Sequence, residues 1–258
     1  MNTQRRLVIL QPGEKLASLA AVPGDFADWI LAGMGYPAGS GVLVVRPHAG
    51  EPLPAPGEVA AAVVTGSSAM VDDGHDWIEP CAHWLRELLA LGRPVLGICF
   101  GHQLLAHALG GEVRENPNGI EVGTVRTHLT DAAPADPLFG GLATVIPVQA
   151  SHRQCVITLP PGAVRLAASD MDLNHAFRFG SNAWGLQFHP EFDREITRAY
   201  IERYRPDLEA SGRPVERMLG ETAETVEPGG LLRRFGRELQ ADSSGLTANS
   251  LGDRSADQ

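Results

Sequence analysis

The chain has 258 residues, 43% hydrophobic and 20% charged, and a formal net charge of −10. This length allows a single α/β domain that folds without disulfides, and the acidic balance argues against nucleic-acid binding, which usually needs a basic surface. The three cysteines are widely spaced and form no Cys-x-x-Cys motif. They predict free thiols in a reducing, cytoplasmic setting. The N-terminal apolar run of four residues is too short for a signal peptide or a membrane span.

In the first hundred residues, short apolar runs alternate with segments of helical period. Strands are predicted at 7–10, 42–45, 60–64 and 95–98, with helices at 25–34 and 76–91. Asp76 is expected to cap the second helix, with Glu79 completing a capping box. Strands that alternate with helices are typical of βαβ units. We therefore expect an α/β fold, with a mostly parallel twisted sheet and helices on both faces.

The pattern changes in the second half of the chain. Residues 122–188 contain short strand-like pieces without a long helix between them, and these are expected to extend the sheet with some antiparallel pairing. Helices are predicted at 191–204, 215–219 and 230–239. No linker is visible, so residues 1–240 are expected to form one domain. Residues 241–258 have few apolar side chains and are predicted to be a disordered tail.

A cysteine lies at the point where the fourth predicted strand runs into the next helical segment. Cys99 is flanked by Gly97 and Gly101, in the Gly-x-nucleophile-x-Gly pattern of a nucleophile elbow. The glycines remove Cβ atoms that would clash at so sharp a turn. The free N–H groups at the start of a helix favour the thiolate form of such a cysteine. The alternative is that Cys99 is simply a small buried hydrophobic residue.

A thiol nucleophile needs a base, and the base needs a group that orients it. The segment GLQFHPEF is an apolar strand that ends at His189, with Glu191 two residues later. Residues two apart in an extended segment face the same way, so Glu191 can bond one imidazole nitrogen while the other faces Cys99. The alternative is a surface histidine beside a glutamate that caps the following helix.

The segments GICFGHQLLAHALGG and GLQFHPEF resemble the two signatures of class I (triad-type) glutamine amidotransferases, in particular the amidotransferase domain of GMP synthetases. The resemblance covers about residues 7–204, and it implies the flavodoxin-like class I amidotransferase fold. It further implies that Cys99 attacks the side-chain amide of glutamine and forms a γ-glutamyl thioester. His189 would protonate the departing ammonia and later activate water, and Glu191 would orient His189.

The resemblance also implies an oxyanion hole for the tetrahedral intermediate. One donor is expected to be the backbone N–H of Phe100, next to the nucleophile. The second is expected from the loop after the third strand, at Gly66 and Ser67. The family often has two glycines and a proline there, whereas this chain has Gly66-Ser67-Ser68. A backbone donor tolerates that change.

Substrate contacts follow from the same resemblance. Gln103 matches a family glutamine that contacts the bound substrate, and the stretch Ser151-His152-Arg153 matches a segment that lines the pocket largely through its backbone. Gln154 stands where many relatives have an acidic residue. Arg153 can pair with a substrate carboxylate, although a lone exposed arginine is more often only solvated.

Other polar residues give no sign of a metal or cofactor. His102 and His107, five apart, do not share a helix face, and His75 and His83 have no cysteine or acid cluster beside them. Asp72-Asp73 are expected to cap a helix, with the mouth of the pocket as an alternative position. The chain has no glycine-rich nucleotide loop. We therefore expect neither a metal nor a cofactor.

Three functions remain open at this stage. The first is a glutamine amidotransferase or glutaminase that releases ammonia, with a separate synthetase as the ammonia acceptor. The second is a γ-glutamyl peptidase that uses the same triad on γ-glutamyl amides other than glutamine. The third is a non-catalytic binding protein on this fold. In each case the expected partner is a small molecule, and neither a nucleic acid nor a membrane is expected.

Overall fold

The computed structural model describes residues 5–37 and 40–248. Within these residues a nine-stranded sheet forms the centre of the molecule, and β5 (Glu112–Glu115) pairs with β8 (Gln154–Thr158) in a separate two-stranded sheet. The nine strands, in their order across the sheet, are β2 (Leu43–Val45), β1 (Arg6–Leu10), β3 (Val59–Val64), β4 (Val95–Ile98), β11 (Ala183–Leu186), β10 (Ala176–Phe179), β9 (Val164–Ser169), β6 (Glu121–Leu129) and β7 (Val145–His152).

The sheet has a parallel half and an antiparallel half. Strands β2, β1, β3, β4 and β11 pair in parallel, whereas β11, β10, β9, β6 and β7 pair in antiparallel. This confirms the predicted α/β fold, with antiparallel strands extending the sheet. Strand β11 lies beside β4, with Leu186 opposite Ile98. The carboxyl ends of both strands therefore meet at one edge, which is where α/β proteins place their sites.

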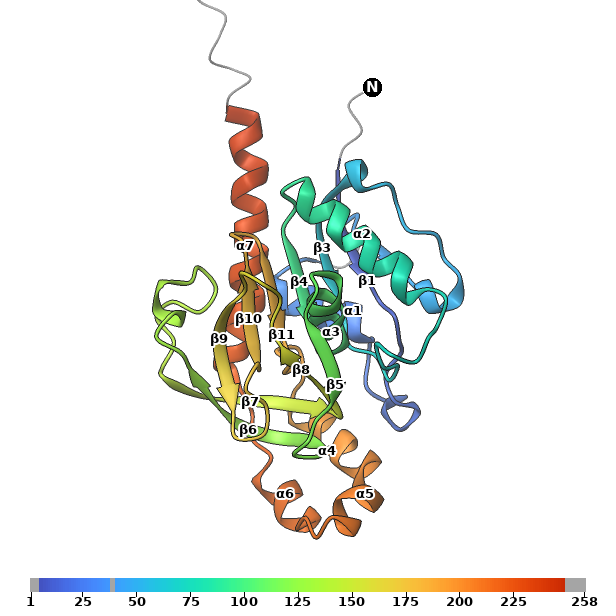
Figure 1. The fold of residues 1–258 in the computed structure, drawn as a ribbon, viewed down its shortest axis with the longest axis vertical. Helices are drawn as coiled ribbons and strands as arrows, with labels where there is room; N and C mark the ends of the chain where they lie inside the picture. The colour runs from blue at the N-terminus through green and yellow to red at the C-terminus, as the bar shows by residue number, and fades with distance from the viewer. Residues whose placement is uncertain (1–4, 38–39, 249–258) are drawn as a thin grey trace, which may run out of the picture.

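Helices cover both faces of the sheet, as predicted (Figure 1). Alternating side chains of β1 enter two different apolar clusters, because successive residues of a strand point to opposite faces. Helices α1 (Phe26–Met34) and α7 (Val226–Ala248) pack on one face, and α2 (Ile78–Ala90) and α3 (Phe100–Ala108) pack on the other. Helix α4 (Arg194–Arg203) packs against β6 and β7, and α5 (Arg205–Ala210) and α6 (Val215–Glu221) follow it.

Helix α7 is longer than the sequence predicts. It packs on α1 through Leu231, Leu232 and Phe235, which are almost fully buried, and it continues to Ala248. Residues 241–248 belong to this helix, and they contain no proline that would interrupt its i→i−4 bonds. The rest of the predicted tail, 249–258, lies outside the described residues. Figure 1 shows the last turns of α7 extending past the sheet.

The start of α2 also differs from the prediction. Trp77, in helical conformation, occupies the N-cap position, and no side chain caps this helix. The predicted capping box of Asp76 and Glu79 is therefore wrong. Glu79 instead bonds His107 of α3, with 2.5 Å between Oε1 and Nε2. The Trp77 ring packs against the Phe100 ring, with 5.5 Å between their centroids.

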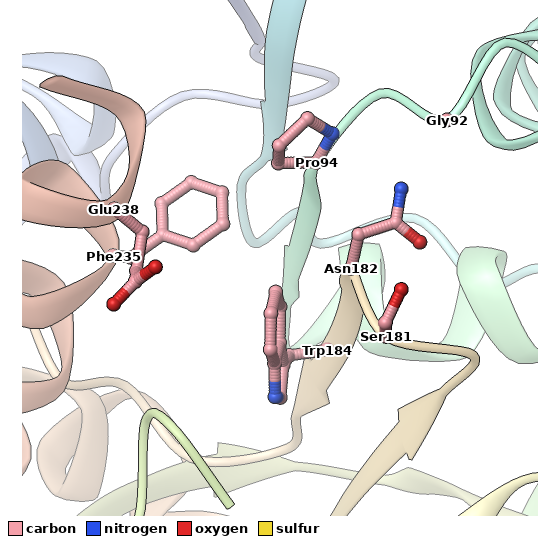
Figure 2. A pocket seen from close by; sticks show the side chains of 7 residues that line it. All are labelled: Gly92, Pro94, Ser181, Asn182, Trp184, Phe235 and Glu238. Carbon is pink, nitrogen blue, oxygen red and sulfur yellow. The ribbon is translucent and has the colours of Figure 1, made fainter. Parts of the chain in front are cut away.

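A hollow of about 360 Å³ lies at the amino-terminal ends of β4 and β11, beside α7 (Figure 2). The predicted site lies at the other ends of these strands, their carboxyl ends. The residues that line the hollow are Gly92, Pro94, Ser181, Asn182, Trp184, Phe235 and Glu238.

Among the described residues, no helix has both the length and the apolar character needed to cross a bilayer.

Candidate active site

The corner between β4 and α3 has the geometry of a nucleophile elbow. Cys99 has φ 53° and ψ −105°, and among the described residues it is the one non-glycine residue with positive φ. A Cβ on Gly97 would lie 2.3 Å from the carbonyl oxygen of Gly101, and a Cβ on Gly101 would lie 2.2 Å from that of Val64. Both flanking positions therefore require glycine. The surrounding backbone holds Cys99 in a strained conformation of the kind found at functional sites.

His189 and Glu191 come together as predicted, but not on the predicted strand, because β11 ends at Leu186 and residues 190–191 form a turn. His189 Nδ1 lies 2.7 Å from Glu191 Oε1, and both side chains are buried, at 3% and 0% exposure. The backbone N–H of His189 donates to the carbonyl of Gln149 on β7. Glu191 does not cap α4, because Asp193 is the N-cap and accepts from the N–H of Ile196.

The surroundings of His189 favour its charged form. The Phe192 ring stacks on the imidazole, with 3.8 Å between centroids and 10° between planes. Burial opposes the imidazolium, but the negative charges of Glu191 and Cys99 and a hydrogen bond to Cys99 raise the pKa of His189 to about 10. Because Nδ1 bonds Glu191, Nε2 is the ring atom left for Cys99. This arrangement suits a thiolate beside an imidazolium.

The other two cysteines lie in different surroundings. All three cysteines are buried, and burial raises the pKa of the Cys81 and Cys155 thiols to about 12. Neither has the elbow conformation of Cys99. Buried thiols of this kind remain protonated and inert at neutral pH.

The predicted oxyanion loop lies against the cysteine and the histidine. A Cβ on Gly66 would lie 2.9 Å from His189 Cε1 and 3.7 Å from Cys99 Cβ. The Ser67 hydroxyl donates to the carbonyl of Pro12 and accepts from the N–H of Ala69, so the loop is fixed by its own contacts. Phe100 is the first residue of α3, and N–H groups in the first turn of a helix have no intrahelical partner.

Gln103 is buried, at 3% exposure. Its Nε2 donates to the carbonyl of Gln154 at 2.8 Å and to Gln187 Oε1 at 3.0 Å. Gln154 in turn donates to Asp72 Oδ1 at 2.5 Å, and Asp73 accepts from the N–H of Met70. Neither aspartate caps α2, contrary to the sequence expectation. The amide group of Gln103 thus fixes the start of β8.

The remaining predicted residues are Ser151 and His152, at the end of β7, and Arg153, between β7 and β8. The carbonyl oxygen of Ser151 lies 3.6 Å from Cys99 Sγ. The imidazole of His152 is buried and bonds Glu121. Arg153 pairs with Asp207 and lies over the Tyr204 ring, 5.2 Å from its centroid.

Sequence reasoning missed the partners of His152 and Arg153. Glu121 is 31 residues from His152, and Asp207 is 54 residues from Arg153, so no local motif marks either one. Within the described residues, Glu121, His152 and His175 form one buried group with metal-type donor atoms inside 4.8 Å. However, the donors of Glu121 and His152 bond each other directly, at 2.9 Å.

The sequence of residues 53–203 matches the family of class-I glutamine amidotransferases. The chain belongs to this family.

Three individual relatives illustrate the range of the family. Gamma-glutamyl peptidase 5 of Arabidopsis thaliana is 34% identical over 145 residues, which are 55% of this chain and 57% of that protein. A glutamine-hydrolysing GMP synthase subunit of Halobacterium salinarum is 37% identical over 130 residues, which are 50% and 64%. The chain thus spans less than two thirds of the length of either relative. The crystal structure of a glutamine amido transferase from Methylobacillus flagellatus superimposes with a TM-score of 0.72 at 26% identity, covering 94% of this chain and 95% of that one.

Proposed function

We propose that this chain hydrolyses the side-chain amide of glutamine through a γ-glutamyl thioester on Cys99. One observation carries the proposal: Cys99 stands on a strained corner beside an imidazole that is held by a buried carboxylate. Membership of the class-I glutamine amidotransferase family supports it. A nucleophile, a base and a group that orients the base are the parts that acyl transfer needs.

The chemistry follows from the positions of these three side chains. The Cys99 thiolate attacks the γ-carbonyl carbon of glutamine and forms a tetrahedral intermediate. The His189 imidazolium gives its proton to the leaving nitrogen, the carbon–nitrogen bond breaks, and ammonia departs. Neutral His189 then takes a proton from water, which attacks the thioester and releases glutamate. Glu191 keeps the imidazole oriented and stabilises its charged form throughout.

The negative oxygen of the intermediate needs hydrogen-bond donors that are already in place. We propose the backbone N–H of Phe100 as one donor, because Phe100 begins α3 directly after the nucleophile. We propose the loop of Gly66 and Ser67 as the source of the second donor, because Gly66 lies against both Cys99 and His189. A donor set built from backbone N–H groups needs no metal or cofactor.

A second candidate is the hydrolysis of γ-glutamyl amides other than glutamine. The observation in its favour is the match to a protein named gamma-glutamyl peptidase. The acyl half of the reaction is the same, and only the leaving amine differs. If glutamine is the substrate, we propose that a separate synthetase uses the released ammonia, because one matched relative is named a GMP synthase subunit.

The test compares glutamine with γ-glutamyl dipeptides as substrates of the purified chain. Glutamate, ammonia and amine release are followed for the native chain, Cys99→Ala and the matched control Cys81→Ala. Faster turnover of glutamine that vanishes only in Cys99→Ala supports the first candidate, and faster turnover of the dipeptides supports the second. Turnover of neither substrate contradicts catalysis by the isolated chain and favours a binding protein.

A further inference from the structure

A second buried histidine–carboxylate pair lies close to Cys99. Glu121 on β6 and His152 on β7 are register partners at one end of the antiparallel ladder. Their side chains are 2% and 1% exposed, and His152 Nε2 lies 2.9 Å from Glu121 Oε2. A buried carboxylate needs such a partner, because an unpaired charge in the protein interior is strongly unfavourable.

The contacts of His152 define its protonation. Its Nδ1 lies 2.9 Å from the carbonyl oxygen of Gln154. A carbonyl oxygen and a carboxylate oxygen both only accept hydrogen bonds, so both ring nitrogens of His152 must donate. His152 is therefore an imidazolium. Burial opposes this form, but the carboxylate of Glu121 raises the pKa of His152.

A second histidine faces the same carboxylate. His175 Nε2 lies 3.4 Å from Glu121 Oε2, and its Nδ1 lies 2.8 Å from the hydroxyl of Thr127. Burial favours the neutral acid, but the hydrogen bond from His152 and the nearby imidazole of His175 lower the pKa of Glu121. The charged carboxylate on β6 thus lies between His152 of β7 and His175, the residue before β10.

The backbone around His152 carries contacts to the proposed catalytic residues. The Ser151 carbonyl faces Cys99 Sγ, and the Gln149 carbonyl accepts from the N–H of His189. The Gln154 carbonyl, which accepts from His152, also accepts from Gln103. The ion pair therefore holds the stretch of backbone that contacts Cys99, His189 and Gln103.

We propose that Glu121 and His152 are a positioning pair for substrate binding. The pair does not touch substrate. It fixes the backbone of residues 151–154, so that this stretch receives the α-amino-acid end of a γ-glutamyl substrate while Cys99 receives the amide. This inference rests on the proposed function. A direct acid–base role is excluded, because both imidazole nitrogens of His152 already donate to acceptors within the protein.

Two electrophiles separate positioning from nucleophile strength. 6-Diazo-5-oxo-L-norleucine carries the α-amino-acid end of glutamine, whereas iodoacetamide lacks it, and both alkylate a reactive thiolate. The variant Glu121→Gln keeps the shape of the side chain and removes its charge. The exposed Glu58→Gln is the matched control. Rates of Cys99 alkylation are measured by mass spectrometry for each protein and each reagent.

We expect Glu121→Gln to lower the ratio of the alkylation rate with 6-diazo-5-oxo-L-norleucine to the rate with iodoacetamide by about tenfold or more, because small displacements in a binding site have effects of this size. The rate with iodoacetamide should stay within about twofold, and Glu58→Gln should match the native chain. An unchanged ratio, or an equal fall in both rates, overturns the positioning role. A native chain without preference for the glutamine-shaped reagent would instead contradict the proposed function, and the positioning role with it.

A measurement on the native chain keeps the inference testable if Glu121→Gln does not fold. In ¹⁵N-labelled protein near neutral pH, both ring nitrogens of His152, assigned through its own backbone amide, should show the shifts of protonated imidazole nitrogens. An unprotonated ring nitrogen at neutral pH overturns the inference, because the buried ion pair would then be absent.

Discussion

Two buried histidine–carboxylate pairs lie close to Cys99, and they differ in what the second imidazole nitrogen does. His189 bonds Glu191 at 2.7 Å, and its other nitrogen is left for the thiol. His152 bonds Glu121 at 2.9 Å, and its other nitrogen is fixed by a backbone carbonyl. The first ring can exchange a proton with a reactant, whereas the second can only hold its proton. Burial and a carboxylate partner therefore do not by themselves identify a catalytic histidine.

The largest expected effect separates the two histidines. We expect His189→Gln to lower kcat by about 10⁴-fold or more, because the general acid and base is lost. His152→Gln should act mainly by raising KM, because it disturbs the segment that binds substrate. Steady-state kinetics on glutamine, or on the preferred γ-glutamyl amide, measure both effects. Equal losses of kcat in the two variants would contradict the different roles assigned to His189 and His152.

The next effect concerns the carboxylate of the catalytic pair. Glu191→Gln should lower kcat by about 10²- to 10⁴-fold, because an amide cannot enforce the tautomer and charge that His189 needs. The exposed Glu195→Gln on α4 is the matched control and should retain native rates. A Glu191→Gln variant with native kcat would show that this carboxylate does not orient His189.

A smaller effect is expected at the loop that faces both residues. Gly66→Ala places a methyl group 2.9 Å from His189 Cε1, so the imidazole or the loop must shift. We expect kcat to fall about 10- to 100-fold, as a displacement of this size does in an active site. Gly57→Ala, where an added Cβ meets nothing within 4 Å, is the control. Native kcat in Gly66→Ala would remove this loop from the proposed oxyanion hole.

The last effect is on stability and its dependence on pH, and it leaves the chemistry of turnover aside. The pKa of His189 is raised to about 10 in the folded chain, above the value of about 6.5 expected when unfolded. Its ion pair therefore contributes stability that is complete below about pH 6.5 and is lost as the pH rises through about 10. Urea unfolding should show the advantage of the native chain over His189→Gln shrinking across this range. A constant or growing advantage would contradict the charged state assigned to His189.

The sequence predicts the parts of this site that depend on neighbouring residues. The elbow at Cys99 follows from two glycines beside it. The pair of His189 and Glu191 is predicted from their spacing on a strand, but β11 ends at Leu186 and the two residues meet across a turn. In the parallel half, the predicted strands agree with β1 to β4 to within one residue at each end. Short-range geometry decides all of these features, so the local pattern is sufficient.

The features that the sequence did not reveal depend on distant contacts. The pairing of Glu121 with His152 is set by the register of β6 on β7, and that of Arg153 with Asp207 by the packing of α5. The start of α2 at Ile78 is another case, because tertiary contacts replaced the expected side-chain cap. Strand register and helix docking depend on the whole core, which no short motif encodes.

The central claim is that Cys99 forms a γ-glutamyl thioester during turnover. The most direct measurement is to quench the native chain in acid while it turns over glutamine or a γ-glutamyl dipeptide, and to map acylated peptides by mass spectrometry. We predict one γ-glutamyl adduct, on the peptide that contains Cys99, which disappears in Cys99→Ala. Turnover without an adduct at Cys99, or with an adduct on Cys81 or Cys155 instead, would contradict the mechanism.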